Sequence, residues 1–303
     1  MIRPQDCHTQ SQPTPASSHE RPRWSRVPSA IVLAVARDSS HGFTVIELLV
    51  LVLLLSLLAS SVLPALARSR RSDHVLQCLN NHRQLLIAWK MYAADNSDAL
   101  IYNLSLSGSS LNWANNVMDW SANGMNTNLS LLQKGPLAPY LGGQVTAYSC
   151  PADHYVSPPQ QALGWSRRTR SVSMNSFFGP YTTNSAAPGP TANSFYPSYR
   201  QFLKLAQVPG PGRFFVTIDE HPDSINDGYF INDPRATSFW GDIPASNHQG
   251  ACGLGFADGH SEMHAWLSSR TKTPIRFFYS SPALDPLGRT DYNWLAARTA
   301  ALR

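Results

Sequence analysis

The stretch "SSHGFTVIELLVLVLLLSLLASSVLPALARSRR", residues 39–71, decides the fold. Residues 48–67 form a run of 20 without a formal charge, which as an α-helix is long enough to cross the hydrocarbon core of a bilayer. A buried helix of a globular protein would normally carry a polar stripe, and no such stripe precedes Arg68. The pattern therefore predicts a membrane-spanning helix, with a buried core helix as the alternative.

Glu47 lies near the start of this apolar run. A charged side chain inside a bilayer costs free energy, so an ionisable residue in such a segment points to a function that involves a partner. In the simpler alternative, the carboxylate only extends to the lipid headgroups. The residues around Glu47 favour the first interpretation.

The segment "GFTVIELL", residues 42–49, resembles the processing site of type IV pilins and of the pseudopilins of type II secretion systems. The resemblance implies that a prepilin peptidase cuts between Gly42 and Phe43, methylates the new Phe43 amine and leaves the apolar segment attached. It also implies that Glu47 of one subunit meets the Phe43 amine of another during filament assembly. An ordinary secretory signal is cut after its apolar region, and "ALARS" at residues 65–69 keeps that alternative open.

The charge distribution argues against a nucleic-acid partner. The whole chain has a formal net charge of +5, but residues 72–303 contain 16 Lys and Arg against 15 Asp and Glu. The excess of positive charge therefore lies around the apolar segment, where basic residues suit anionic lipid headgroups. The rest of the chain lacks the basic face that a DNA-binding domain needs.

The chain divides into four predicted parts. Residues 1–42 form the leader, 43–67 the transmembrane helix, 68–96 its amphipathic continuation and 97–303 a globular head. The continuation is indicated by apolar residues at three-to-four spacing, among them Leu79, Leu86, Trp89 and Ala93. We expect a single-pass inner-membrane protein whose head lies in the periplasm or on an extracellular filament.

Three segments of the head predict strands. They are "RSVSMNSFF" at residues 170–178, "GRFFVTIDE" at 212–220 and "ACGLGFADGHSEMHAW" at 251–266. The last predicts a hairpin, because Asp258 and Gly259 are a favoured pair for a two-residue type I′ turn. The expected fold class is α+β and pilin-like: a long N-terminal transmembrane and amphipathic helix packed on an antiparallel sheet.

The segment "HQGACGLGFADGH" resembles the H-x9-DG signature found near the C-terminal end of many prepilin-like proteins, here at residues 248–259. Polar residues near it and in the preceding strand could form an ion site or simply shape turns, and their spacing matches no metal or catalytic motif. Pseudopilins often hold a structural calcium ion, so the resemblance keeps calcium open; otherwise no cofactor is expected. The candidate residues are Asp219, His221, Asp227, His248, Asp258 and His260.

Four cysteines are present, and Cys7 would leave with the leader. In an oxidising compartment, a disulfide between Cys78 and Cys150 would tie the head to its helix and leave Cys252 free. The alternative is three reduced core thiols.

These features favour a structural subunit without enzymatic activity, part of a type IV pilus-like or type II secretion pseudopilus filament. The expected partners are prepilin peptidase, other pilin or pseudopilin subunits, an inner-membrane assembly platform and membrane lipid. The alternative is a membrane-anchored ectodomain that binds or hydrolyses an extracellular substrate such as a glycan. In that case the sugar would stack on exposed aromatic residues such as Trp113, Trp120 and Trp165.

Overall fold

The computed structural model of the chain describes residues 42–105, 109–183, 192–193, 195–235 and 239–303, without the side chains of residue 61 and residues 63–71. The predicted leader, apart from Gly42, and Cys7 lie outside the described residues. The chain divides into two units, Met1–Leu55 and Ser56–Arg303, and the boundary falls inside the first helix.

Helix α1, Val45–Asp95, runs through both predicted helical segments. Its later half has one buried face, formed by residues that recur at three-to-four spacing: Cys78, Leu85, Leu86, Trp89 and Ala93. This is the amphipathic pattern that the sequence predicts, and it places α1 against the head. One long helix from about residue 43 to about residue 96 is therefore confirmed.

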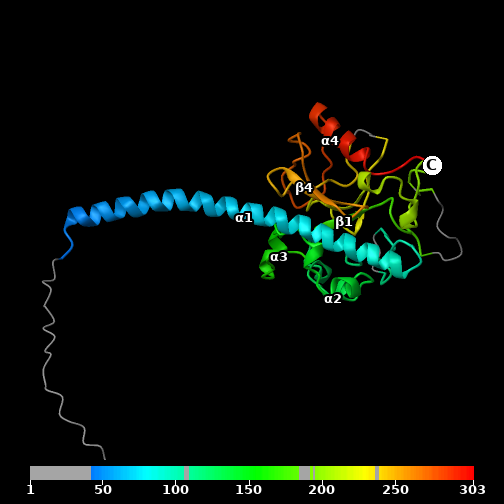
Figure 1. Ribbon diagram of the computed structural model, residues 1–303, viewed down its shortest axis with the longest axis horizontal. Coiled ribbons are helices and arrows are strands. Elements are labelled where there is room, and N and C mark those ends of the chain that lie inside the picture. Colours follow the sequence, from blue (N-terminus) through cyan, green and yellow to red (C-terminus); the bar gives the residue numbers. More distant parts are fainter. Residues whose placement is uncertain (1–41, 106–108, 184–191, 194, 236–238) are drawn as a thin grey trace, which may run out of the picture. The chain divides into compact units, whose positions relative to one another are not determined.

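The head contains a five-stranded sheet in the order β3-β1-β2-β4-β5. The strands are β1 Val172–Asn175, β2 Phe215–Asp219, β3 Tyr229–Phe230, β4 Ala251–Phe256 and β5 Ser261–Ala265. β1 pairs antiparallel with β2 and parallel with β3, while β4 pairs antiparallel with both β2 and β5. Figure 1 shows the sheet beside the later half of α1.

Strand β4 separates two hydrophobic clusters. Cys252 and Leu254 belong to the cluster that contains Tyr292 and Leu295 of helix α4, Pro286–Ala296. Gly253 and Gly255 lie on the opposite face of β4. A Cβ at Gly255 would lie 2.8 Å from Leu86 Cδ1 of α1. Alternation along a strand puts successive residues on opposite faces, so the glycines let α1 approach the sheet closely.

Short elements complete the head. They are η1 Gly124–Asn126, α2 Ser130–Gln133, η2 Ala138–Leu141, η3 Thr146–Tyr148, α3 Pro158–Ala162, η4 Leu205–Gln207 and η5 Pro211–Arg213. Of these, η3 leads directly to Cys150, which belongs to the site described below.

The predicted fold class is wrong in two respects. The sheet is mixed rather than antiparallel, since β3 aligns parallel to β1 through a two-residue pairing. Within the described part of the chain, we also find no helix with the length and apolar character needed to cross a membrane. The transmembrane segment at residues 43–67 and the single-pass inner-membrane location are therefore corrected.

The hairpin of β4 and β5 is confirmed, but its turn differs from the prediction. Gly259 has φ of +104°, whereas Asp258 does not adopt a positive φ. The Gly259 N–H donates to Phe256 O at 2.8 Å, and Phe256 N–H donates to His260 O at 2.9 Å. The loop therefore has three residues, 257–259, with glycine in the position that needs positive φ, which is the next most common hairpin connection.

Candidate functional site

The first turn of α1 is closed by a reciprocal pair of hydrogen bonds between Thr44 and Glu47. The Glu47 backbone N–H donates to Thr44 Oγ1 at 3.2 Å, and the Thr44 backbone N–H donates to Glu47 Oε2 at 2.9 Å. This is a capping box, which satisfies two backbone donors that the helix itself leaves without acceptors. The bond from the Thr44 backbone also lowers the pKa of Glu47. Glu47 therefore has a structural role that the sequence interpretation missed, although T-x-x-E is a recognisable signal.

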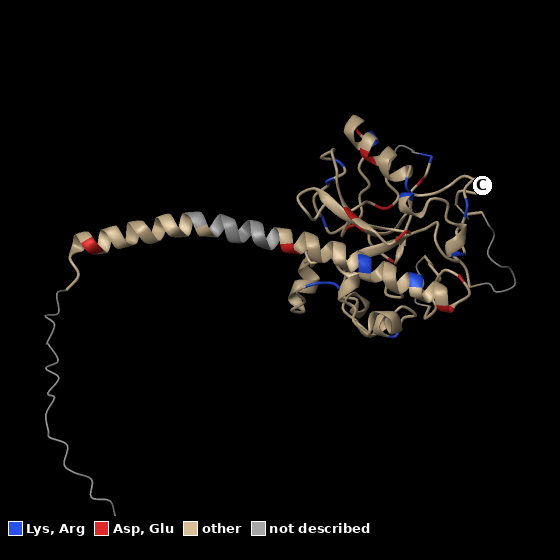
Figure 2. Cartoon of the chain, viewed as in Figure 1, with Lys and Arg blue, Asp and Glu red and all other residues tan. Residues whose placement is uncertain are grey.

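The segment that follows is apolar and exposed on all sides. Each of the ten large apolar side chains between Leu48 and Leu58 is 42–64% exposed. Figure 2 shows an acidic position at the start of α1 and no further charged position before the grey part of the helix. A helix that is apolar all round is normally buried by neighbours.

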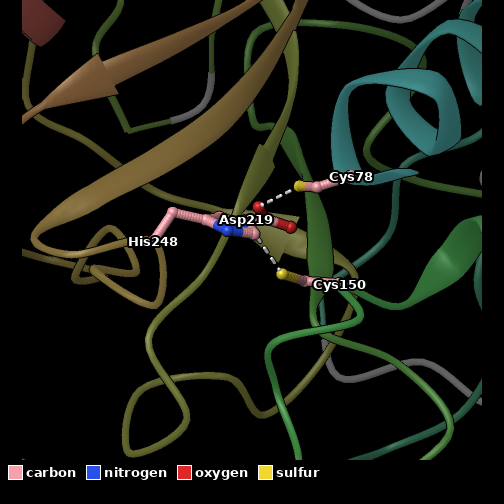
Figure 3. A group of neighbouring side chains, drawn as sticks. All are labelled: Cys78, Cys150, Asp219 and His248. Carbon is pink, nitrogen blue, oxygen red and sulfur yellow. Dashed lines mark hydrogen bonds between the residues drawn. The ribbon is translucent and has the colours of Figure 1, made fainter. Parts of the chain in front are cut away.

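Deep in the head, four side chains from four distant segments meet. The buried Cys-Asp-His group consists of Cys78, Cys150, Asp219 and His248. Cys78 projects from α1, Asp219 ends β2, and the other two lie in loops after η3 and before β4 (Figure 3). One ligand atom from each residue lies within 4.8 Å of all the others.

Two short contacts join the group in pairs. The Cys78 thiol donates to Asp219 Oδ2 at 2.9 Å, and Cys150 Sγ lies 3.1 Å from His248 Nε2. The Gly253 backbone N–H also donates to Asp219 Oδ2, at 3.1 Å. A Cβ at Gly253 would lie 2.8 Å from Cys78 Sγ, so the absence of a side chain there leaves room for the group.

His82 flanks the group one helical turn after Cys78. Its Nε2 lies 3.5 Å from Asp219 Oδ1, and neither atom has a hydrogen-bond partner within normal distance. Its Nδ1 lies 2.8 Å from Thr217 Oγ1. When the Thr217 hydroxyl donates to Nδ1, the ring proton is on Nε2 and faces the free oxygen of Asp219.

Burial and the mutual contacts set the protonation of the group. The hydrogen bond with Cys150 and burial raise the pKa of the Cys78 thiol. The bond with Cys78 lowers the pKa of Cys150, but burial and the charge of Asp219 leave it above the usual value. Burial raises the pKa of Asp219, yet His82 and Cys78 bring it below the usual value, and burial lowers the pKa of His248. The group thus holds two neutral thiols, a carboxylate and a neutral imidazole near pH 7.

The structure divides the six candidate polar residues. Asp219 and His248 join the buried group, together with the two cysteines that the sequence interpretation had paired as a disulfide. That disulfide is not formed, since Cys78, Cys150 and Cys252 are all free thiols. The four residues were not predicted as one group because each comes from a different segment and their spacing forms no motif.

The other four candidates make contacts outside the buried group. His221 Nε2 lies 3.0 Å from Thr273 O, and the Tyr229 backbone N–H donates to Asp227 Oδ1 at 2.8 Å. Asp258 Oδ1 lies 2.6 Å from His260 Nδ1. Among the described residues, none of these four belongs to a group with metal-ligand proximity. Two sulfur donors also make the buried group unsuited to calcium, which takes oxygen ligands.

The aromatic surface expected for a glycan-binding ectodomain is partly absent. Trp113 is fully buried and stacks on Tyr148, with ring centroids 5.6 Å apart. Trp120 is half-buried beneath the guanidinium of Arg168, whose Cζ lies 3.9 Å from the ring centroid. Trp165 is half-buried. The predicted exposure of Trp113 is therefore wrong, since its indole N–H donates inward to Asn103 Oδ1 at 3.1 Å.

Comparisons with protein-family models, with curated proteins and with solved structures found no match to this chain. The resemblance to pilin-like proteins stays a prediction.

Proposed function

We propose that the chain is a structural subunit that assembles with further copies of itself through the apolar first part of α1. The observation that carries the proposal is the exposure of apolar side chains on every side of the helix between Leu48 and Leu58. Burying one such side chain contributes about 1.5–3 kcal/mol. A single partner would cover only one face, whereas a helix surrounded by copies in a filament is covered on all sides.

Processing between Gly42 and Phe43 fits this assembly. Phe43 is exposed and lies outside the capping box, so a prepilin peptidase could reach the junction without opening the first helical turn. The cut would create a positively charged amine at Phe43. Glu47 of an incoming subunit supplies the opposite charge, and pairing the two charges within an apolar bundle fixes the axial offset between neighbouring helices.

Two substitutions separate the capping role of Glu47 from its role in assembly. Glu47→Gln keeps an oxygen that accepts from the Thr44 N–H, so the capping box persists, but it removes the charge. Glu47→Val removes both. With prepilin peptidase co-expressed, we expect both variants to be cut after Gly42, and Gly42→Asp to remain full length.

Assembly is measured by electron microscopy of filaments and by crosslinking between subunits. We expect Glu47→Gln to lower the yield of assembled subunits about tenfold or more, since tenfold in association corresponds to about 1.4 kcal/mol for one charge pair. Circular dichroism should show its helix content unchanged. Wild-type assembly by Glu47→Gln, together with failure of Glu47→Val, would mean that Glu47 acts only as a cap.

A further inference from the structure

The buried Cys-Asp-His group has the composition of a metal centre rather than of a catalytic or redox pair. We propose that this group binds one Zn²⁺ ion through one ligand atom from each of its four residues. The inference is independent of the proposed assembly, because it concerns the head and the later half of α1 and not the apolar first part of that helix.

The donor set selects the metal. Two thiolates, one imidazole nitrogen and one carboxylate oxygen are the ligands that Zn²⁺ takes in four-coordinate protein sites. Magnesium and calcium require oxygen ligands, so Cys78 and Cys150 exclude them. Sulfur and nitrogen donors in a compact tetrahedral arrangement favour zinc among the common divalent ions.

The geometry needs little adjustment. Ligand atoms bound to one tetrahedral zinc ion at about 2.0–2.3 Å lie roughly 3.3–3.8 Å from one another. In the structure all four ligand atoms lie within 4.8 Å of one another, and the two closest pairs are at 2.9 and 3.1 Å. Zinc binding would lengthen these two contacts by roughly half an ångström and draw the remaining atoms closer.

The protons displaced by zinc binding can be accounted for. Each thiol releases one proton to solvent as its sulfur binds zinc, so Cys78 no longer donates to Asp219 Oδ2. That oxygen becomes free to bind the metal and keeps its bond from the Gly253 N–H. His248 is neutral and binds through Nε2, the atom that lies beside Cys150 Sγ.

His82 is placed to orient the Asp219 carboxylate as a metal ligand. His82 Nε2 and Asp219 Oδ1 are both buried without a hydrogen-bond partner, and they face each other at 3.5 Å. A small closing movement would let His82 donate to the carboxylate oxygen that does not bind zinc. Contacts of this kind orient metal ligands and raise metal affinity.

The site is closed, and its role is therefore structural. Four protein ligands leave no open position for substrate, and all four residues are buried, with exposed fractions of 9% or less. The ion would join α1 to the end of β2 and to two loops of the head. Binding only to the folded chain, it stabilises the head by mass action.

Metal analysis of the purified full chain, prepared with a reductant and without chelator, tests the proposal. We expect about one zinc ion per chain, and about one Co²⁺ after exchange, with the near-ultraviolet absorption of cobalt-bound thiolate. Cys150→Ser and His248→Ala should lose most of the metal. Cys252→Ser is the matched control, because Cys252 is a buried free thiol outside the group, and it should retain the full content.

The cobalt spectrum is measured on the wild-type protein, so this part of the test does not depend on whether a variant folds. Thermal unfolding gives a second measurement: removal of zinc by a chelator should lower the Tm of the wild type and of Cys252→Ser. Any of three results would overturn the proposal. They are cobalt bound without thiolate absorption, equal zinc content in wild type and His248→Ala, and a Cys78–Cys150 disulfide found by mass spectrometry of the unreduced protein.

Discussion

His264 should make the stability of the head sensitive to acid. It lies on β5 and stacks on Trp294 of α4, with ring centroids 3.4 Å apart. The guanidinium of Arg298 also lies against Trp294, with Cζ 4.0 Å from the ring centroid. The pKa of His264 is lowered to about 4, mainly by burial; the charge of Asp291 opposes this shift and the charge of Arg298 adds to it.

The sign follows from the two pKa values. In the folded chain His264 is neutral down to about pH 4, whereas in the unfolded chain it takes up a proton near its ordinary value of 6.5. The unfolded state therefore binds more protons between these values, and the stability present above pH 6.5 is lost as the pH falls toward 4. Each unit of difference between the two pKa values corresponds to about 1.4 kcal/mol, which sets an upper limit of about 3.5 kcal/mol on the stability lost. Because His264 is only about half-buried, solvent screening reduces this to about 1–2 kcal/mol.

The assay compares urea unfolding of wild type and His264→Gln at about pH 7 and about pH 4.5, with tryptophan fluorescence as the signal. Glutamine is neutral at both pH values, so contributions from all other groups cancel in the difference between the two proteins. We expect the wild type to lose about 1–2 kcal/mol more than the variant on acidification. The reasoning would be refuted if the difference in free energy of unfolding between wild type and His264→Gln were the same at both pH values. It would also be refuted if NMR gave His264 in the folded chain a pKa of 6.5 or above.

Two further changes test the packing of the head. Leu86→Ala removes a fully buried side chain that fills the space over Gly255, and should lower the free energy of unfolding by about 2–5 kcal/mol in urea titrations; a loss below about 1 kcal/mol would contradict the close approach of α1 to β4. Gly179→Ala places a Cβ directly against Ile101 O at a residue with φ of +80°, so thermal unfolding should show a much lower Tm. Gly124→Ala, where a Cβ meets nothing within 4 Å, should leave the Tm nearly unchanged, and equal effects of the two alanines would count against the steric argument.

Periodicity predicted the elements that have a strong repeating pattern. The buried positions from Leu85 to Ala93 recur with the helical period, and the two strands of the hairpin flank an Asp-Gly pair. β3 has only two residues, too few for any pattern, and its parallel pairing with β1 is set by tertiary contacts. α4 was missed although Asp285 before Pro286 is a helix-start signal, and the Asp285 side chain indeed accepts from Gly288 N–H.

The buried group shows why sites are harder to predict than elements. The sequence interpretation selected all four of its residues, but assigned Cys78 and Cys150 to a disulfide and Asp219 and His248 to a polar cluster. Their convergence depends on how closely α1 approaches β4, which is possible because Gly253 has no side chain. Local pattern carries no information about such a contact between distant segments.

The hydrogen bonds between Thr44 and Glu47 close the first turn of α1 within four consecutive residues. The start of a helix is also the positive pole of its aligned peptide dipoles, equivalent to roughly half an elementary charge. Release of an amine at Phe43 would add a second positive charge beside that pole and favour fraying of the first turn. Glu47 brings negative charge into the same turn, so the side chain that closes the cap also offsets the new charge. Thr44 and Glu47 both lie on the C-terminal side of the cut, so the capping box would persist after the loss of every residue before Phe43.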